Sequence, residues 1–348
     1  MGLGEVAVNR IGKSVMTFPN APSIVGFAAV GGKKEGEGPL GLNFDLLDDT
    51  NTFGEKTWEK SESRMQREAG VRALAKAGLP EGGVDMVLAG DLLNQCIGTS
   101  FAMRDLDVPL IGLYGACSTM AEGMAVGAAM ISGGFASKLL CATSSHFCSA
   151  ERQYRLPIEY GGQRPPSAQW TATAAGAAVL SEDGEGPFVR AAMAPTAAAS
   201  LSRFLKDTGM NPKDFDLIAT GDLSRVGTDI LYELMDNEGF DIRGVHNDCG
   251  LMLYTGEQDV DSGGSGCGCS ASVLCAGLLP DMVGGRLKRL LFTGTGALLS
   301  PTSALQGGEH TRYMPRGVYP RAGGRIEHGI FQSLHNRRGD MHHRPVID

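Results

Sequence analysis

Short apolar runs alternate with longer segments of mixed polarity along most of this chain. Residues 84–89 and 138–143 are apolar runs of strand length, and residues 171–180 are built mainly of Thr, Ala and Val. Residues 55–77 place apolar side chains loosely on one side of a helix that Gly78 and Pro80 would end. Because strands alternate with helices, the pattern predicts an α/β fold with mostly parallel sheets covered by helices.

Residues 109–131 combine a predicted strand, a turn and a helix around one cysteine. The apolar run at the start predicts a buried strand, Gly115-Ala-Cys117 predicts a tight turn, and Ser118 or Thr119 is the expected N-cap of a helix rich in small residues. The dipole of a helix lowers the pKa of a thiol at its N-terminal end. Cys117 is therefore a candidate reactive thiolate. The alternative is a small buried apolar residue, which is a common role of free cysteine.

Features of this first part return later in the chain, in the same order. Residues 85–92, Asp-Met-Val-Leu-Ala-Gly-Asp-Leu, return at 216–223 as Asp-Leu-Ile-Ala-Thr-Gly-Asp-Leu. Ala116-Cys-Ser returns as Gly268-Cys-Ser, and residues 138–143 return at 289–294. The repeat predicts two homologous halves, residues 1–185 and 186–307. Ligands of such folds bind at the carboxyl ends of the strands.

From residue 308 the composition changes. Five of the seven histidines of the chain lie after this point, together with seven arginines and no lysine. The segment shows neither a helical nor a strand period. The histidines also lack the regular spacing of a metal site. We expect residues 308–348 to form a poorly ordered, peripheral tail.

Charge and cysteine usage narrow the function classes. A net charge of −8 argues against a nucleic-acid partner. Eight cysteines without a secretory segment predict reduced thiols in a soluble, cytoplasmic protein, and the longest uncharged run is too short to span a membrane. Cys267-Gly-Cys269 lacks the spacing and the second pair that zinc requires, so no metal site is expected.

Several motifs between residues 15 and 307 carry a family resemblance. They include Gly38-Pro-Leu-Gly, Leu88-Ala-Gly-Asp-Leu-Leu-Asn-Gln, Gly115-Ala-Cys-Ser-Thr, Ala142-Thr-Ser-Ser-His, Thr220-Gly-Asp-Leu-Ser and Gly263-Gly-Ser-Gly-Cys. The chain resembles the thiolase and ketoacyl-synthase superfamily and, within it, the stage V sporulation protein AD family. This resemblance implies a thiolase-like fold of two duplicated α/β halves. The segment 180–192 is shorter than in that family, and the tail does not resemble its C-terminus.

The resemblance also implies a function. A protein of this family would bind dipicolinic acid (pyridine-2,6-dicarboxylate), with Ca²⁺, for its uptake into the developing spore and its release in germination. Other stage V sporulation membrane proteins would be its partners, and it would be peripheral at the spore inner membrane. Thiolase relatives imply a homodimer, and no cofactor is expected.

The alternative is an acyl-transferring condensing enzyme that uses Cys117 as nucleophile. Such an enzyme also needs two His or Asn side chains that stabilise the oxyanion and activate the substrate. By resemblance these positions fall at Thr220-Gly221 and about Cys267, which are neither His nor Asn. His146 and His246 would replace them only if they reached the thiol. We therefore expect a binding protein without catalytic residues.

A dianionic aromatic ligand needs cations, backbone N–H groups and a ring to stack on. Residues 150–160 supply arginines and tyrosines directly after a predicted strand, and the alternative for them is a solvated loop with a Glu151–Arg155 pair. Arg225 is a second candidate cation. The expected site lies between the halves and is lined by Cys117, Ser145, His146, Arg152, Arg155, Tyr160, Asp222 and Cys267.

Overall fold

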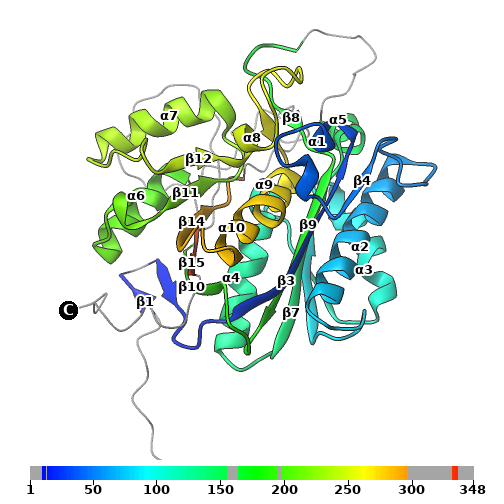
Figure 1. Ribbon diagram of the computed structural model, residues 1–348, viewed down its shortest axis with the longest axis horizontal. Coiled ribbons are helices and arrows are strands. Elements are labelled where there is room, and N and C mark those ends of the chain that lie inside the picture. The colour runs from blue at the N-terminus through cyan, green and yellow to red at the C-terminus, as the bar shows by residue number, and fades with distance from the viewer. Residues whose placement is uncertain (1–9, 13, 155–163, 194–196, 297–330, 336–348) are drawn as a thin grey trace, which may run out of the picture.

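The computed structural model describes residues 10–12, 14–154, 164–193, 197–296 and 331–335 (Figure 1). The first half of the chain forms five strands of the main sheet, in the spatial order β6-β5-β7-β9-β3. β5 is parallel to β6 and β7, whereas β9 is antiparallel to β7 and β3. The bounds are β3 Ser23–Gly32, β5 Met86–Gly90, β6 Leu110–Gly112, β7 Lys138–Ser145 and β9 Ala174–Ser181.

The second half repeats this arrangement strand for strand, in the order β12-β11-β14-β15-β10. β11 is parallel to β12 and β14, and β15 is antiparallel to β14 and β10. The two sets meet where Phe188 of β10 pairs with Ser23 of β3. The bounds are β10 Phe188–Met193, β11 Leu217–Thr220, β12 His246–Asp248, β14 Arg289–Thr293 and β15 Phe331–His335.

One repeated aspartate shows how the duplicated sequence builds the duplicated fold. Asp85 accepts hydrogen bonds from the backbone N–H groups of Ser137 (2.7 Å) and Lys138 (2.9 Å), which fixes the start of β7 beside β5. Asp216 does the same for β14 through Lys288 (2.7 Å) and Arg289 (2.8 Å). The fold is therefore α/β with two duplicated halves, as the sequence predicted. The boundaries at residues 185 and 307 remain predictions.

Helices form three layers around the two sets of strands (Figure 1). α2 packs on β3, β7 and β9, and α3 packs beside it. α4 and α9 lie between the halves and contact each other, in the largest apolar core. α6 and α7 cover the outer face of the second half through a third core. The bounds are α1 Lys33–Gly36, α2 Trp58–Lys76, α3 Ile97–Met103, α4 Thr119–Ser132, α5 Phe147–Tyr154, α6 Ala197–Thr208, α7 Ser224–Asn237, α8 Cys249–Met252, α9 Cys267–Val273 and α10 Leu279–Val283.

The remaining strands are short. β8 and β13 pair in parallel as a separate two-stranded sheet, while β1, β2 and β4 join the main sheet at its margins. Their bounds are β1 Arg10–Ile11, β2 Val15–Thr17, β4 Leu46–Asp48, β8 Trp170–Thr171 and β13 Gly264–Ser265. Within the described part of the chain, no helix has the length and apolar character needed to cross a membrane.

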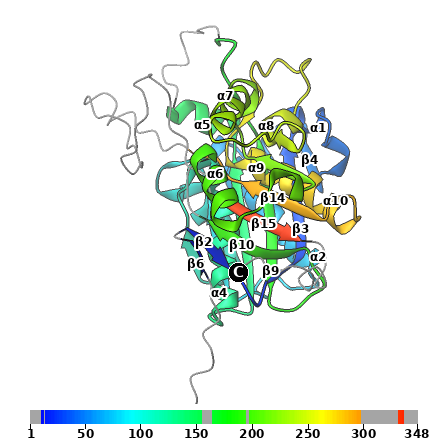
Figure 2. The same ribbon diagram turned by 90° about the vertical axis from the view of Figure 1, so that its left-hand side faces the viewer.

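Three elements differ from the sequence predictions. The strand expected to be buried before Cys117 is β6, whose three residues are exposed at the end of the sheet. The polar segment after β7, expected to be a loop, begins with helix α5. The predicted peripheral tail contains β15, which lies between β14 and β10 (Figure 2). The sequence showed no sign of β15 because Phe-Gln-Ser-Leu-His contains neither an apolar run nor a strict alternation of apolar and polar residues. The rest of the 308–348 segment lies outside the described residues.

Candidate functional site

Cys117 lies in the turn between β6 and α4, at the boundary between the two halves. Ala116, directly before it, has a φ of 49°, and its left-handed backbone makes the tight turn that the sequence predicted. The half-buried thiol lies near Asp222, which follows β11 in the other half and whose charge acts on the thiol. From α9 of the same half, the Ser270 hydroxyl donates to the Cys117 carbonyl oxygen (3.3 Å). The turn is thus fixed by the partner half as well as by its own helix.

The electrostatics of this centre oppose thiolate formation. Burial, followed by the charge of Asp222, raises the pKa of Cys117 well above its ordinary value. The expectation of a lowered pKa at the helix N-terminus is therefore wrong, because burial and a neighbouring carboxyl both raise the pKa of this thiol. A protonated thiol is a weak nucleophile.

Asp222 is itself held firmly. Its carboxyl accepts from the backbone N–H of Gly266 (2.9 Å), the hydroxyl of Ser265 (3.1 Å) and the hydroxyl of Thr295. Only 7% of the residue is exposed, and burial raises the pKa of this carboxyl as well. Three hydrogen-bond donors therefore hold the Asp222 carboxyl in place near Cys117.

Cys267 and Ser145 bind the two halves together. The Cys267 thiol is buried and donates to the carbonyl oxygen of Ser144 (3.0 Å), and burial raises its pKa well above the ordinary value. The Ser145 hydroxyl donates to the Ala172 carbonyl oxygen (2.7 Å) and accepts from the Gly268 N–H (3.1 Å). The Cys267 thiol and the Ser145 hydroxyl therefore each make a hydrogen bond from one half to the other, and both residues stabilise the contact between the halves.

Both candidate histidines are engaged away from the thiol. The backbone N–H of Cys148 donates to Nδ1 of His146 (3.2 Å), so Nε2 carries the proton and donates to the Asn51 carbonyl oxygen (2.8 Å). His246 lies between the hydroxyls of Thr220 (3.0 Å) and Tyr232 (3.1 Å). Burial lowers the pKa of both imidazoles, to about 4 for His246. Neither ring is placed to take a proton from Cys117.

Two hollows open near α5. The first, about 310 Å³, lies at the carboxyl ends of β3 and β7. Its lining comprises Lys33, Lys34, Glu35, Glu37, Asn51, Trp58, His146, Phe147, Cys148, Trp170 and Thr173. The second, about 400 Å³ and shallower, is lined by Glu59, Leu93, Asn94, Ile97, Ser149, Arg152 and Gln153.

Comparison with known proteins identifies the family. The model of the family "Stage V sporulation protein AD (SpoVAD)" matches residues 12–192 and 189–311. The chain belongs to the SpoVAD family. It is 40% identical over 333 residues to stage V sporulation protein AD of Bacillus subtilis (strain 168), an alignment that covers 90% of this chain and 98% of that protein.

Solved structures confirm the thiolase-like fold. A variant of OleA from Xanthomonas campestris matches with a TM-score of 0.57 at 15% identity, covering 92% of this chain and 99% of that one. The 3-oxoacyl-(acyl carrier protein) synthase III, FabH, from Xanthomonas oryzae pv. oryzae matches with a TM-score of 0.55 at 15% identity, covering 92% and 100%. At such identity the likeness concerns the fold alone.

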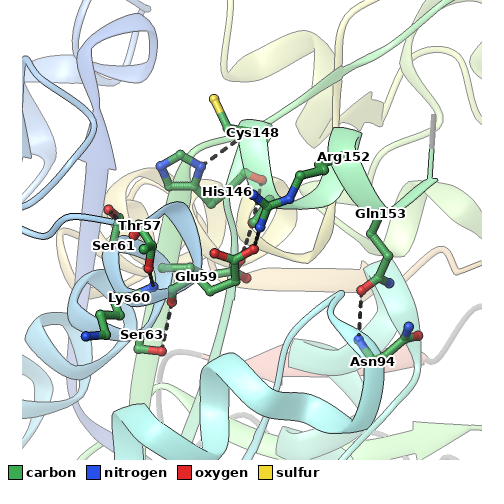
Figure 3. A network of polar contacts seen from close by, with 12 residues as sticks. Thr57, Glu59, Lys60, Ser61, Ser63, Asn94, His146, Cys148, Arg152 and Gln153 are labelled. Carbon is green, nitrogen blue, oxygen red and sulfur yellow. Dashed lines mark hydrogen bonds and ion pairs between the residues drawn. The ribbon is translucent and has the colours of Figure 1, made fainter. Parts of the chain in front are cut away.

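In this SpoVAD chain the eight predicted site residues do not line one pocket. Cys117, Asp222 and Cys267 come together, and Ser145 supports them from behind. His146 lines the first hollow and Arg152 the second. Figure 3 shows Arg152 of α5 turned toward Glu59 of α2, with which it forms an ion pair, and Gln153 turned toward Asn94. Arg155 and Tyr160 lie outside the described residues.

The single-pocket prediction is wrong for Arg152 because α5 turns this side chain toward α2. The sequence predicted a loop here, and a loop would not have fixed the direction of the Arg152 side chain. Arg225 lies at the start of α7, where its N–H donates to the carbonyl oxygen of Ser262 (2.9 Å). Among the described residues, no group of three or more His, Cys, Asp or Glu is placed to hold a metal ion.

Sequence reasoning missed the first hollow. Glu35, Trp58 and Trp170 come from segments far apart in the chain, and none belongs to a recognisable motif. One signal was present, since Lys33, Lys34 and Glu35 follow the apolar run of residues 23–30, and ligands of such folds bind at the carboxyl ends of strands.

Proposed function

We propose that this protein binds pyridine-2,6-dicarboxylate, together with Ca²⁺, for its uptake into the developing spore and its release in germination. Membership in a sporulation family supports a role in spores. The observation that carries the proposal of binding, as opposed to catalysis, is that both candidate histidines are held by partners other than Cys117, the Asn51 carbonyl oxygen for His146 and the Thr220 hydroxyl for His246.

A condensing enzyme would need the Cys117 thiol as a thiolate. A carboxyl is too weak a base to remove the proton from a thiol whose pKa is raised well above its usual value. The imidazoles of His146 and His246 are held by other partners. Losing one oxyanion donor costs about 10²–10³ in rate, so losing the activating base as well leaves little catalysis.

Ca²⁺ belongs in the proposal for an electrostatic reason. The protein carries a net charge of −8, so its overall field does not attract a dianion. A Ca²⁺ ion bound to the carboxylates of the ligand neutralises them and accepts further oxygen ligands from the protein. We also propose a peripheral position at the spore inner membrane beside other stage V sporulation membrane proteins.

Isothermal titration calorimetry with pyridine-2,6-dicarboxylate, with and without Ca²⁺, tests this function. Pyridine-2-carboxylate is the matched control because it keeps the ring and lacks one carboxylate. Losing one charge-assisted contact should weaken binding about tenfold to a hundredfold. Equal affinities for the two compounds, or no binding of the dicarboxylate, would contradict the proposal.

Intact-mass spectrometry after incubation with acyl-CoA thioesters tests the enzymatic alternative. We expect no stoichiometric adduct. An acyl adduct that disappears in Cys117→Ala would identify Cys117 as a nucleophile and restore the condensing enzyme.

A further inference from the structure

Helix α7 presents apolar side chains to the outside of the molecule as well as to its core. On the inward face, Leu231 and Met235 are buried in the core of the second half. On the outward face, Val226, Ile230 and Leu234 are 43%, 52% and 38% exposed. A helix that covers one face of a domain needs only one apolar stripe. The second apolar face of α7 therefore serves no packing purpose among the residues that the structure describes.

The three outward residues form one continuous row, which we call the α7 ridge. They are spaced four residues apart, so they follow one another along the helix over about 12 Å. Figure 1 shows α7 at the periphery of the molecule. Single exposed apolar residues are ordinary on a protein surface, whereas a contiguous group of them marks an interaction site.

The neighbouring helix α6 shows the usual outward face of this layer. It packs on the same core as α7, through Leu201, Phe204 and Leu205. Among its described side chains, the exposed ones are Ala199, Arg203 and Lys206. Two helices that fill one core thus differ in the face they turn outward, and only α7 has an apolar row there. The core does not require the α7 ridge.

Acidic side chains flank the α7 ridge on one side. Asp229 and Glu233 are exposed and lie on the adjacent row of the helix. Neither forms an ion pair or a hydrogen bond with any residue that the structure describes, whereas Asp236, further round the helix, pairs with Arg243. The one basic residue of α7 is Arg225, which precedes the ridge. The exposed surface therefore combines an apolar row with unpaired negative charge.

This combination selects the chemistry of the occupant. A second copy of the same face would bring more negative charge and no lysine to the contact, and an anionic lipid surface would be repelled as well. A helix with its own apolar groove accepts a row of side chains spaced by four. Lysines or arginines beside that groove would pair with the two carboxylates.

We propose that the α7 ridge docks a helix of another protein. The apolar side chains of that helix pack on Val226, Ile230 and Leu234, and its lysines or arginines pair with Asp229 and Glu233. None of these five residues lines either hollow near α5. The contact is thus a partner-binding surface apart from Cys117 and the hollows, and it does not depend on which small molecule the protein binds.

Photo-crosslinking in sporulating cells tests this contact. The full chain carries benzoylphenylalanine in place of Asn237, which is exposed at the end of α7 and leaves the ridge intact. The control carries it in place of Arg203 on α6. Mass spectrometry of the crosslinked peptides should show, from position 237 alone, another protein joined at a segment with apolar residues at helical spacing and several lysines or arginines. A crosslink to a second copy, to lipid or to an acidic segment, or no crosslink, would overturn the proposal.

Charge reversal tests the basic character of the partner. Asp229→Lys combined with Glu233→Lys turns two attractions into repulsions, so the yield of the crosslink from position 237 should fall by about fivefold or more. Arg203→Glu on α6 is the matched control and should leave the yield within about twofold. An undiminished yield in the double variant would show that the partner is not recognised by its positive charge.

Ile230→Glu separates docking from folding. Because Ile230 is half exposed, the purified full-length variant should melt within a few degrees of the unmodified protein, with the same mass by analytical ultracentrifugation, and should lose the crosslink. A larger fall in melting temperature would mean that the ridge is covered within the chain itself. A changed mass would mean that a second copy covers it. Either result would overturn the proposal.

Discussion

At the scale of single residues, the chemistry of Cys117 depends on a neighbour from the other half of the chain. Asp91 and Asp222 occupy equivalent places in the repeated Gly-Asp-Leu motif. Asp91 accepts from the backbone N–H groups of Leu93 (2.7 Å) and Thr99 (2.6 Å) within its own half. Asp222 likewise accepts within its own half, from the Gly266 N–H (2.9 Å), but its charge also acts on the Cys117 thiol of the other half. Two copies of one motif have therefore acquired different roles.

Asp222→Asn should make Cys117 easier to ionise. The substitution removes the negative charge that contributes to the raised pKa of Cys117, whereas the larger contribution from burial stays. We expect the pH dependence of Cys117 alkylation by iodoacetamide to move to lower pH. Peptide-resolved mass spectrometry measures it for each cysteine.

Cys96 provides the internal reference for that experiment. Burial and Asp91, not Asp222, raise the pKa of its thiol. Its alkylation profile should therefore be the same in both proteins. An unchanged Cys117 profile would contradict the assigned role of Asp222.

At the scale of elements, a chain of hydrogen bonds joins α7, β11 and β12. Thr220 donates its proton to Asp248 (2.6 Å), so its oxygen accepts from Nε2 of His246 (3.0 Å), and Nδ1 of His246 accepts from the Tyr232 hydroxyl (3.1 Å). Each of these three hydrogen bonds therefore has only one possible donor. The imidazole is consequently neutral in the folded protein.

His246 should make stability depend on pH. Burial lowers its folded pKa to about 4, below the unfolded value near 6.5, so the unfolded state binds more protons between these values. The contribution is fully present above about pH 6.5 and is lost as the pH falls toward 4, by up to about 3 kcal/mol. His146 acts in the same direction.

Urea unfolding of His246→Gln at several pH values measures this contribution. The variant should lose less stability than the unmodified protein between pH 7 and pH 4, because Gln does not titrate. Parallel curves for the two proteins would show that His246 is not the titrating group.

At the scale of the whole molecule, the two halves share a helical layer and a continuous set of strands. α4 of the first half packs on α9 of the second, and α4 also contacts β10 and β15. β15 is paired on both sides, to β14 and to β10. Each half therefore completes its core with residues of the other.

Truncation after residue 306 should destabilise the protein strongly. It removes β15 and leaves the facing edges of β14 and β10 without their hydrogen-bond partner. We expect the melting temperature to fall by roughly 10 °C or more, or the protein to aggregate.

Truncation after residue 335 is the control, since it keeps β15. The melting temperature of this truncated protein should lie within a few degrees of that of the full chain. If the protein truncated after residue 306 also melted within a few degrees, the strand would contribute little, and the segment would be peripheral as its composition suggests.

The sequence by itself determined several of the central elements and their repetition. Apolar runs marked β5, β7 and β14, glycine and proline marked the end of α2, and the repeated Asp85 and Asp216 perform the same task in both halves. These features can be recognised in the sequence because a buried strand or a buried helix face requires apolar residues at neighbouring or periodic positions. The fold class followed from them.

Only the tertiary structure decided which side chains meet. It turned Arg152 toward Glu59, His146 toward Asn51 and Cys117 toward Asp222, and it gathered Glu35, Trp58 and Trp170 around one hollow. It also placed β15 inside the sheet. Contacts between distant segments depend on the direction in which each helix or turn points its side chains and on how strongly the meeting groups are desolvated. Neither property leaves a periodic pattern in the sequence.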